Sequence, residues 1–309
     1  MTPALTITGL SKTYPTGVRA LSDVSLTIPT GMFGLLGPNG AGKSTLMRTL
    51  ATLQEADGGS VRMGDIDVLR DKDAVRRTLG YLPQDFGVYP KVSAEELLDH
   101  LARLKGLTDS RQRREVVGAL LRQTNLYDVR RKALGSYSGG MRQRFGIAQA
   151  LLGNPRLVIV DESTAGLDPE ERVRFHNLLA EIGENVIVIL STHIVSDVSD
   201  LCGRMAIIDK GRVLLTGRPP EFTRMLEGWV WQKAIERNDL EAAKALYPVI
   251  SSRLLAGRTL INVVSGTPPG EGFVAVPPTL EDVYFAAIAG RLPRSPETIG
   301  SMDHLVFIE

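Results

Sequence analysis

The chain has 309 residues, of which 43% are apolar and 23% are charged, and its formal net charge is +1. This composition is typical of a soluble globular protein. The near-neutral net charge excludes an overall electrostatic attraction of the whole chain to nucleic acid or to an anionic membrane. The single cysteine, Cys202, excludes an intramolecular disulfide framework and a cysteine-rich metal site.

The first half of the chain predicts an α/β core. We expect short strands at residues 5–8 and 20–28, then a strand at 32–36 that stops at glycine and is followed by a helix from about Lys43. A strand, a glycine-rich turn and a helix form half of a β-α-β unit. The apolar runs 157–160 and 186–190 are continuous, as expected for parallel strands that are covered on both faces.

Residues from about 85 to 152 predict a helical subdomain inserted into this core, with helices near 92–104 and 111–121. Its arginines are interpreted as solvated helix faces rather than as a surface for lipid or nucleic acid. They are residues 111, 113, 114, 130 and 131. Strands at 205–209 and 212–215, joined at Lys210-Gly211, predict a hairpin that closes a main domain of residues 1–216.

A small α+β unit is predicted for residues 217–290. The expected strands are 229–235, 249–255, 260–264 and 273–276, and the expected helices are 240–246 and 280–289. Residues 291–309 are interpreted as a linker and tail. No segment resembles a secretory signal or the roughly 18 apolar residues of a membrane-spanning helix, so we expect a cytoplasmic chain that needs another polypeptide to cross a membrane.

The segment after the strand at 32–36 matches the phosphate-binding pattern G-x-x-x-x-G-K-[ST]. Its residues are Gly37, Pro38, Asn39, Gly40, Ala41, Gly42, Lys43, Ser44 and Thr45. Glycines allow backbone N–H groups to turn toward phosphate oxygens at the positive end of the following helix. Lys43 is expected to neutralise phosphate charge and Ser44 to ligate Mg²⁺, so ATP and Mg²⁺ are the predicted ligands.

Polar residues follow two of the predicted parallel strands. Asp161 and Glu162 end the first, and His193 follows the second. The carboxyl ends of strands in open α/β sheets share one edge, so these groups should converge on the loop at Gly37. One carboxylate is suited to hold Mg²⁺ and the next to polarise an attacking water. An acidic helix cap is the alternative interpretation of Glu162.

Together these residues resemble the ATP-binding cassette (ABC) ATPases that drive membrane transporters. The resemblance covers about residues 5–216, and its most diagnostic segment is Ser138-Gly139-Gly140-Met141-Arg142-Gln143, which is similar to the family's signature motif. It implies a P-loop NTPase core with a mixed, largely parallel sheet, an antiparallel β subdomain and the helical subdomain. It also implies a head-to-tail homodimer, in which Ser138, Gly139 and Gly140 contact the γ-phosphate bound by the opposite subunit. A simple helix cap would explain the serine but not the order of the motifs.

The resemblance also assigns single residues. Tyr14 resembles the aromatic residue that stacks on adenine, and Gln84 the glutamine that links Mg²⁺ and the attacking water to the helical subdomain. Ala165-Gly166-Leu167-Asp168 resembles the loop that crosses the dimer interface, and His193 the histidine that contacts the γ-phosphate. A strand aromatic and a loop glutamine without a role are the alternatives for the first two. His100, His176 and His304 are interpreted as surface or packing residues.

The sequence departs from the family pattern at Tyr137, Met141 and Ser163, where leucine, glutamine and proline are commoner. No departure removes a charge or a phosphate donor, so hydrolysis should be retained. The Ser-Gly-Gly-Met-Arg variant and residues 278–284, Pro-Thr-Leu-Glu-Asp-Val-Tyr, resemble the branch that includes drug, antibiotic and sodium exporters. We therefore expect the ATPase subunit of an exporter, held at the inner face of the cell membrane by a separate permease.

Other classes of protein are less consistent with these motifs. Soluble ABC-type proteins of translation carry two cassettes per chain, whereas this chain has one phosphate loop. Those of DNA maintenance have a long coiled coil between phosphate loop and signature, and the interval from Lys43 to Ser138 is too short for one. A P-loop kinase or GTPase leaves the Ser138 segment unexplained.

Overall fold

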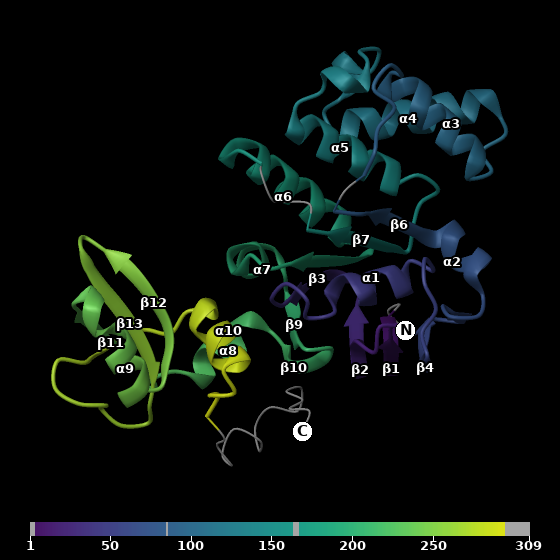
Figure 1. The fold of residues 1–309 in the computed structure, drawn as a ribbon. Helices are drawn as coiled ribbons and strands as arrows, with labels where there is room; N and C mark the ends of the chain where they lie inside the picture. The colour runs from purple at the N-terminus through teal and green to yellow at the C-terminus, as the bar shows by residue number, and fades with distance from the viewer. Residues whose placement is uncertain (1–3, 85, 163–166, 294–309) are drawn as a thin grey trace.

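A six-stranded sheet lies at the centre of the computed structural model, which describes residues 4–84, 86–162 and 167–293 (Figure 1). Its strands in spatial order are β10 (Arg212–Gly217), β9 (Arg204–Asp209), β3 (Gly31–Leu36), β8 (Ile187–Thr192), β7 (Leu157–Asp161) and β6 (Leu79–Leu82). All pair in parallel except β10, which pairs antiparallel with β9. The predicted α/β class and hairpin are confirmed.

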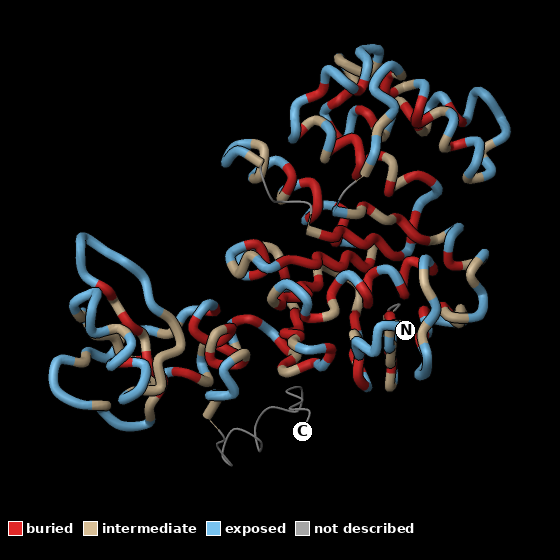
Figure 2. Tube along the Cα trace, viewed as in Figure 1, coloured by how far each residue is buried: buried red, intermediate tan, exposed pale blue. Residues whose placement is uncertain are grey.

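Both faces of this sheet are covered, which explains why its strands are continuously apolar. Every residue of β7 and β8 is buried, and Figure 2 shows burial concentrated in the sheet. One face packs against α1 (Lys43–Leu50) and an antiparallel sheet. That second sheet consists of β2 (Arg19–Pro29), β1 (Ala4–Thr13), β4 (Gly58–Met63) and β5 (Ile66–Asp67). The opposite face packs against α6 (Pro169–Gly183) and α7 (Val195–Leu201).

The predicted helical subdomain has a hydrophobic core of its own and lies beyond β6 in Figure 1. Its elements are α3 (Ala94–Leu104), α4 (Ser110–Gln123), α5 (Gly139–Ala150), η1 (Tyr127–Val129) and η2 (Leu134–Ser136). Ser93 and Glu96 form a capping box at the start of α3, which fixes where that helix begins. The helix α2 (Lys72–Thr78) directly precedes β6, on the sheet side of the boundary between the central sheet and the helical subdomain.

The interpretation of the subdomain arginines as solvated is wrong for Arg113. Its side chain is buried, its Nη1 donates to the carbonyls of Leu107 and Thr108 at 3.1 and 3.0 Å, and Asp99 lies beside its Nε. Arg111, by contrast, has an exposed side chain. The solvated interpretation rested on the run of arginines alone, but the neighbouring loop supplies carbonyl acceptors that let a guanidinium be buried.

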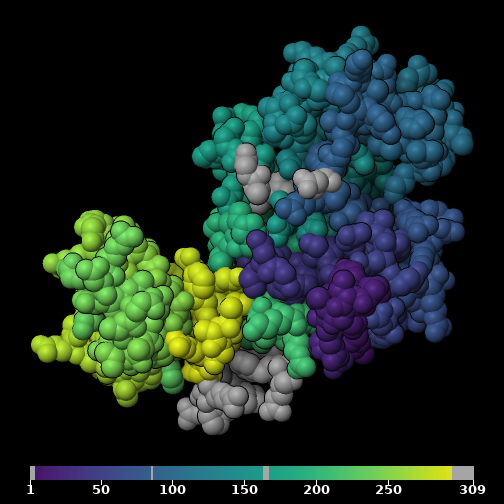
Figure 3. Space-filling model, in the orientation of Figure 1, coloured from purple at the N-terminus to yellow at the C-terminus, as the bar shows by residue number. Residues whose placement is uncertain are grey.

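The C-terminal unit contains the predicted strands and helices. Its sheet has the order β12 (Val249–Leu255), β13 (Arg258–Val264), β11 (Val230–Ile235) and β14 (Val274–Ala275), with η3 (Arg237–Asp239) and α9 (Leu240–Leu246) beside it. In Figure 3 this unit forms a lobe to one side of the rest of the molecule. Two further helices, α8 (Pro219–Met225) and α10 (Leu280–Ile288), share a hydrophobic cluster with the central sheet. Domain boundaries at 216 and 290 therefore remain predictions.

Residues 278–284 connect the C-terminal sheet to the core around the central sheet. Thr279 caps α10, and the Asp282 carboxylate accepts hydrogen bonds from the Thr279 backbone N–H and from Asn262 Nδ2 on β13, at 2.9 and 2.8 Å. Val283 is fully buried in the cluster that contains Met205 of β9. The segment thus has a packing role in this fold. None of the helices in the described ranges has the length and apolar character needed to cross a bilayer.

Candidate nucleotide site

The loop between β3 and α1 turns through two positions that only glycine can occupy. Gly42 has φ +106°, and a Cβ there would lie 2.4 Å from the carbonyl oxygen of Ala20. A Cβ on Gly37 would lie 2.4 Å from the carbonyl oxygen of Ile208. Having no side chain, Gly42 also cannot cap α1, so the N–H groups of that helix end are left to ligands or water.

Lys43 is held under this loop. Its Nζ donates to the carbonyls of Gly37 and Pro38 at 2.7 and 3.1 Å and lies 3.2 Å from Oε1 of Glu162, and its side chain is only 3% exposed. Carbonyl and carboxylate partners satisfy this buried ammonium and hold it in a fixed position. The geometry is therefore suited to neutralising a phosphate group that enters the loop.

Glu162 brings the ends of β7 and β8 together. Its backbone is left-handed, with φ +46°, and its N–H donates to the carbonyl of Ser191 at 2.8 Å. His193, just beyond β8, has Nδ1 at 3.6 Å from Glu162 Oε1. Lys43, Glu162 and His193 thus converge, as the strand-end argument predicted. A non-glycine residue at positive φ is strained, and such strain is concentrated at functional sites.

Asp161 lies beside this group at the end of β7. It is 3% exposed. Burial raises the pKa of its carboxyl group, and the charge of Glu162 acts in the same direction. The hydroxyls of Ser44 and Ser191 and the ammonium of Lys43 act in the opposite direction. A buried carboxylate next to an exposed Ser44 hydroxyl is an oxygen donor set that fits Mg²⁺.

A cavity of about 490 Å³ opens beside the loop. It is lined by Tyr14, Val18, Arg19, Ala20, Asn39, Gly40, Ala41, Gly42, Lys43, Ser44, Thr45, Gln84 and Glu162. Tyr14 and Gln84 thus share one cavity with the loop. The Tyr14 hydroxyl lies 3.2 Å from Thr45 Oγ1 and donates to Gln54 Oε1 at 3.1 Å, which ties the ring to α1. Stacking of the Tyr14 ring on adenine remains a prediction.

The signature residues are not part of this cavity within the described ranges. Ser138 and Gly139 are exposed at the start of α5, where Ser138 Oγ accepts from the Met141 N–H at 3.2 Å. Asp168 is exposed at the start of α6 and caps it through the Glu171 N–H at 2.9 Å. Gly140, the next residue of α5, is buried. Ser138, Gly139 and Asp168 are thus exposed outside the cavity that Lys43 lines, and their predicted contacts with nucleotide remain predictions. Ala165 and Gly166 lie outside the described residues.

Two departures from the family pattern are accommodated in different ways. Tyr137 is buried in the helical subdomain, and its hydroxyl donates to the Val129 carbonyl at 3.1 Å. Met141 contributes to the same hydrophobic cluster. Ser163 and His304 lie outside the described residues. Of the other histidines, His100 is exposed, while His176 Nε2 lies 3.3 Å from the buried Asp197.

Sequence reasoning did not predict three contacts that support the site. Ser191 holds Glu162 through its carbonyl, Gln54 accepts from the Tyr14 hydroxyl, and the Gly211 N–H donates to the Ala41 carbonyl at 2.8 Å. Gly211 could be recognised as a turn residue, but no pattern indicates what a turn contacts. All three act through contacts between segments that are distant in sequence.

A phosphate loop between a buried strand and a helix, with carboxylates at the end of β7 two strands away in the same sheet, defines a P-loop nucleotide-binding protein. Comparison with known proteins narrows this class, because the family described as ABC transporter matches residues 21–165. The uncharacterized ABC transporter ATP-binding protein YxlF of Bacillus subtilis is 31% identical over 303 residues, covering 92% of this chain and 99% of the relative. The daunorubicin/doxorubicin resistance ATP-binding protein DrrA of Streptomyces peucetius is 38% identical over 227 residues, covering 73% of this chain and 68% of the relative.

A solved dimeric ATP-binding cassette in a post-hydrolysis state, bound to ADP and Pi, is similar with a TM-score of 0.63 and 26% identity. The similarity covers 69% of this chain and 98% of that one. This chain belongs to the ATP-binding proteins of ABC transporters. It is therefore an ATP-binding and ATP-hydrolysing subunit, and a role in translation or DNA maintenance is not favoured.

Proposed function

We propose that this chain powers export through a separate membrane-spanning permease, with ATP bound between two copies of the chain. The observation that carries the proposal is the convergence of Lys43, Glu162 and His193 beside the phosphate loop, while Ser138 is exposed elsewhere. Export is supported by the similarity to DrrA, a protein named for resistance to daunorubicin and doxorubicin. The cargo would be selected by the permease.

Hydrolysis is assigned to groups of this chain. Lys43 binds phosphate oxygens. Glu162 accepts a proton from the attacking water while the water oxygen bonds to the γ-phosphorus and the bond from that phosphorus to the β–γ bridging oxygen breaks, so that ADP and phosphate leave. His193 orients the γ-phosphate from the side of β8. Mg²⁺, held by Ser44, Asp161 and Gln84, would neutralise phosphate charge when bound. Tyr14 is assigned to adenine, and the resemblance adds Asp168 to the dimer interface.

The proposed dimer can be tested at Ser138 without removing its cap. Ser138→Asp preserves a capping oxygen for α5 but introduces a negative charge where the partner's γ-phosphate would lie. We expect it to weaken ATP-dependent dimerisation on the order of tenfold or more, because the phosphate oxygens of ATP would face a negatively charged carboxylate instead of a hydroxyl donor. Sedimentation in a Glu162→Gln background, with and without ATP, measures this. The neutral Ser138→Asn is the matched control, and equal dimerisation of both variants would argue against the interface.

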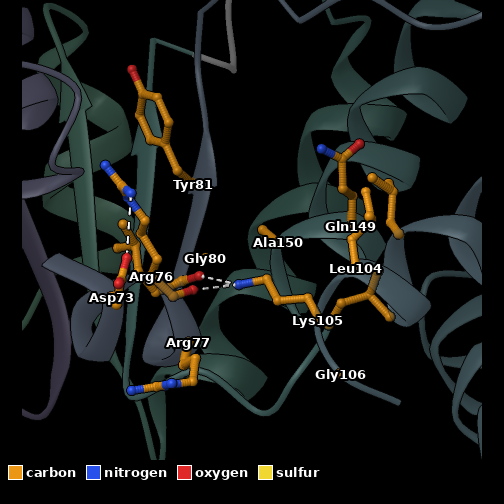
Figure 4. A pocket seen from close by; sticks show the side chains of 13 residues that line it. Asp73, Arg76, Arg77, Gly80, Tyr81, Leu104, Lys105, Gly106, Gln149 and Ala150 are labelled. Carbon is orange, nitrogen blue, oxygen red and sulfur yellow. Dashed lines mark hydrogen bonds and ion pairs between the residues drawn. The ribbon is translucent and has the colours of Figure 1, made fainter. Parts of the chain in front are cut away.

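A cavity of about 630 Å³ at the joint between core and helical subdomain is the proposed contact for the permease. Figure 4 shows the Lys105 side chain reaching across it toward the α2–β6 segment, where its Nζ donates to the carbonyls of Arg76 and Leu79 at 2.8 and 3.0 Å. Arg77 and Leu104 also line the cavity, and Leu104 is 72% exposed. A partner with apolar and acidic side chains is complementary to this surface. Contact at the boundary between core and helical subdomain would couple movement of the subdomain to that partner.

Capture from detergent extracts of membranes tests both the permease and its contact. The wild-type chain is expected to recover a membrane-spanning protein, and Leu104→Glu to recover roughly tenfold less, because burying a leucine contributes about 2 kcal/mol. Leu246→Glu is the matched control, since Leu246 is 74% exposed at the end of α9. Recovery of ribosomal or DNA-repair proteins instead would overturn the transport function, and equal recovery by the two variants would reject this contact.

A further inference from the structure

The turn between β9 and β10 contacts the phosphate loop directly. Lys210 and Gly211 form this turn with φ values of +47° and +76°, the left-handed pair that a tight type I′ hairpin requires. The Gly211 N–H donates to the Ala41 carbonyl at 2.8 Å, and the Gly211 carbonyl accepts from the Ser22 N–H of β2, also at 2.8 Å. One turn residue thus joins the phosphate loop to a strand of the antiparallel sheet.

Three backbone segments meet closely at this point. A Cβ on Gly211 would lie 2.6 Å from the Ala20 carbonyl oxygen, and a Cβ on Gly42 would lie 2.4 Å from the same atom. The two glycines also adjoin one another, since the Gly42 Cβ would lie 3.4 Å from Gly211 Cα. Backbone atoms cannot rotate aside as side chains do, so this arrangement tolerates little displacement of the turn.

The hydrogen bond to Ala41 determines the direction of the peptide that follows it. In a trans peptide the carbonyl and the N–H point in opposite directions. With the Ala41 carbonyl fixed toward Gly211, the N–H of Gly42 points away from the turn. Gly42 lines the cavity and is the residue from which α1 begins. Its N–H is therefore preoriented as a donor for a phosphate oxygen.

We propose that Gly211 is a positioning residue for nucleotide binding, which acts by fixing the Ala41–Gly42 peptide of the phosphate loop. This inference depends on the assignment of Gly37–Thr45 as the ATP site. The turn belongs to strands β9 and β10, which contact α10. The orientation of the Gly42 N–H, a hydrogen-bond donor to phosphate, is therefore set by the part of the core against which the C-terminal unit packs.

The test replaces Gly211 by asparagine, which accepts positive φ better than other residues but brings a Cβ against Ala20. The matched control is Gly257→Asn in the β12–β13 turn. There Ala256 and Gly257 have φ values of +49° and +83°, and an added Cβ would have nothing within 4 Å. The two variants carry a similar backbone cost, but only Gly211→Asn disturbs the phosphate loop.

Titration calorimetry with ATP·Mg²⁺ should give a Kd for Gly211→Asn roughly tenfold or more above wild type, the effect of one charge-assisted hydrogen bond. Turnover at saturating ATP should change by a smaller factor than the Kd, because the substitution does not alter Glu162 or His193. Gly257→Asn should leave Kd unchanged, and melting without nucleotide shows whether both variants are folded. A folded Gly211→Asn with wild-type Kd overturns the proposal. Wild-type Kd in a Lys43→Met variant would instead reject the site itself.

Discussion

Glu162→Gln is expected to lower ATP turnover on the order of 10²-fold or more while ATP binding is retained. The amide keeps the size and position of the side chain at the end of β7 but cannot accept the proton of the attacking water. It also removes the carboxylate that lies 3.2 Å from Lys43 Nζ. Because that carboxylate competes with phosphate for the same ammonium, affinity for ATP should be no weaker than in the wild type. Phosphate release and calorimetry, measured on the same preparation, check both parts.

Glu170→Gln provides a control for Glu162→Gln. Glu170 lies in the first turn of α6 with a side chain that is 76% exposed, and its substitution should leave turnover unchanged. Near-normal turnover in Glu162→Gln would reject Glu162 as the base. Weakened ATP binding in that variant would instead indicate that the Lys43 pair supports the loop rather than competes with the nucleotide.

Lys43→Met is expected to weaken ATP binding by roughly 10²-fold or more. The substitution keeps the aliphatic volume of a side chain that is only 3% exposed, but removes the cation that would contact phosphate oxygens. Hydrogen bonds to charged groups contribute about 1.5–3 kcal/mol each, and more than one is lost. Calorimetric titration with ATP·Mg²⁺ measures the change.

A second basic residue on the same helix controls for charge in the Lys43 experiment. Arg48 is exposed in the last turn of α1 and does not line the cavity, so Arg48→Met should leave the Kd for ATP unchanged. Equal Kd values for Lys43→Met and the wild type would show that the nucleotide binds elsewhere. A large loss in Arg48→Met would indicate a general electrostatic effect of helix α1.

Much of the fold could be predicted because its elements carry local signals. The runs at 157–160 and 186–190 are continuously apolar, and the structure has β7 and β8 there within one or two residues. The helix at 240–246 was predicted at its observed bounds. The burial of Arg113 could not be predicted, because its acceptors are carbonyls of a loop whose path depends on how α3 and α4 pack.

The sequence by itself determined the phosphate loop, the strand-end carboxylates and the turn at Lys210-Gly211. Each depends on residue type at short spacing, and backbone sterics and charge act within a few residues. Only the tertiary structure decided that Lys43 lies against Glu162, that Ser138 is exposed away from the cavity, and that Gly211 fixes the Ala41 carbonyl. Such contacts join distant segments, and their geometry is set by the packing of the sheet and its helices rather than by any local pattern.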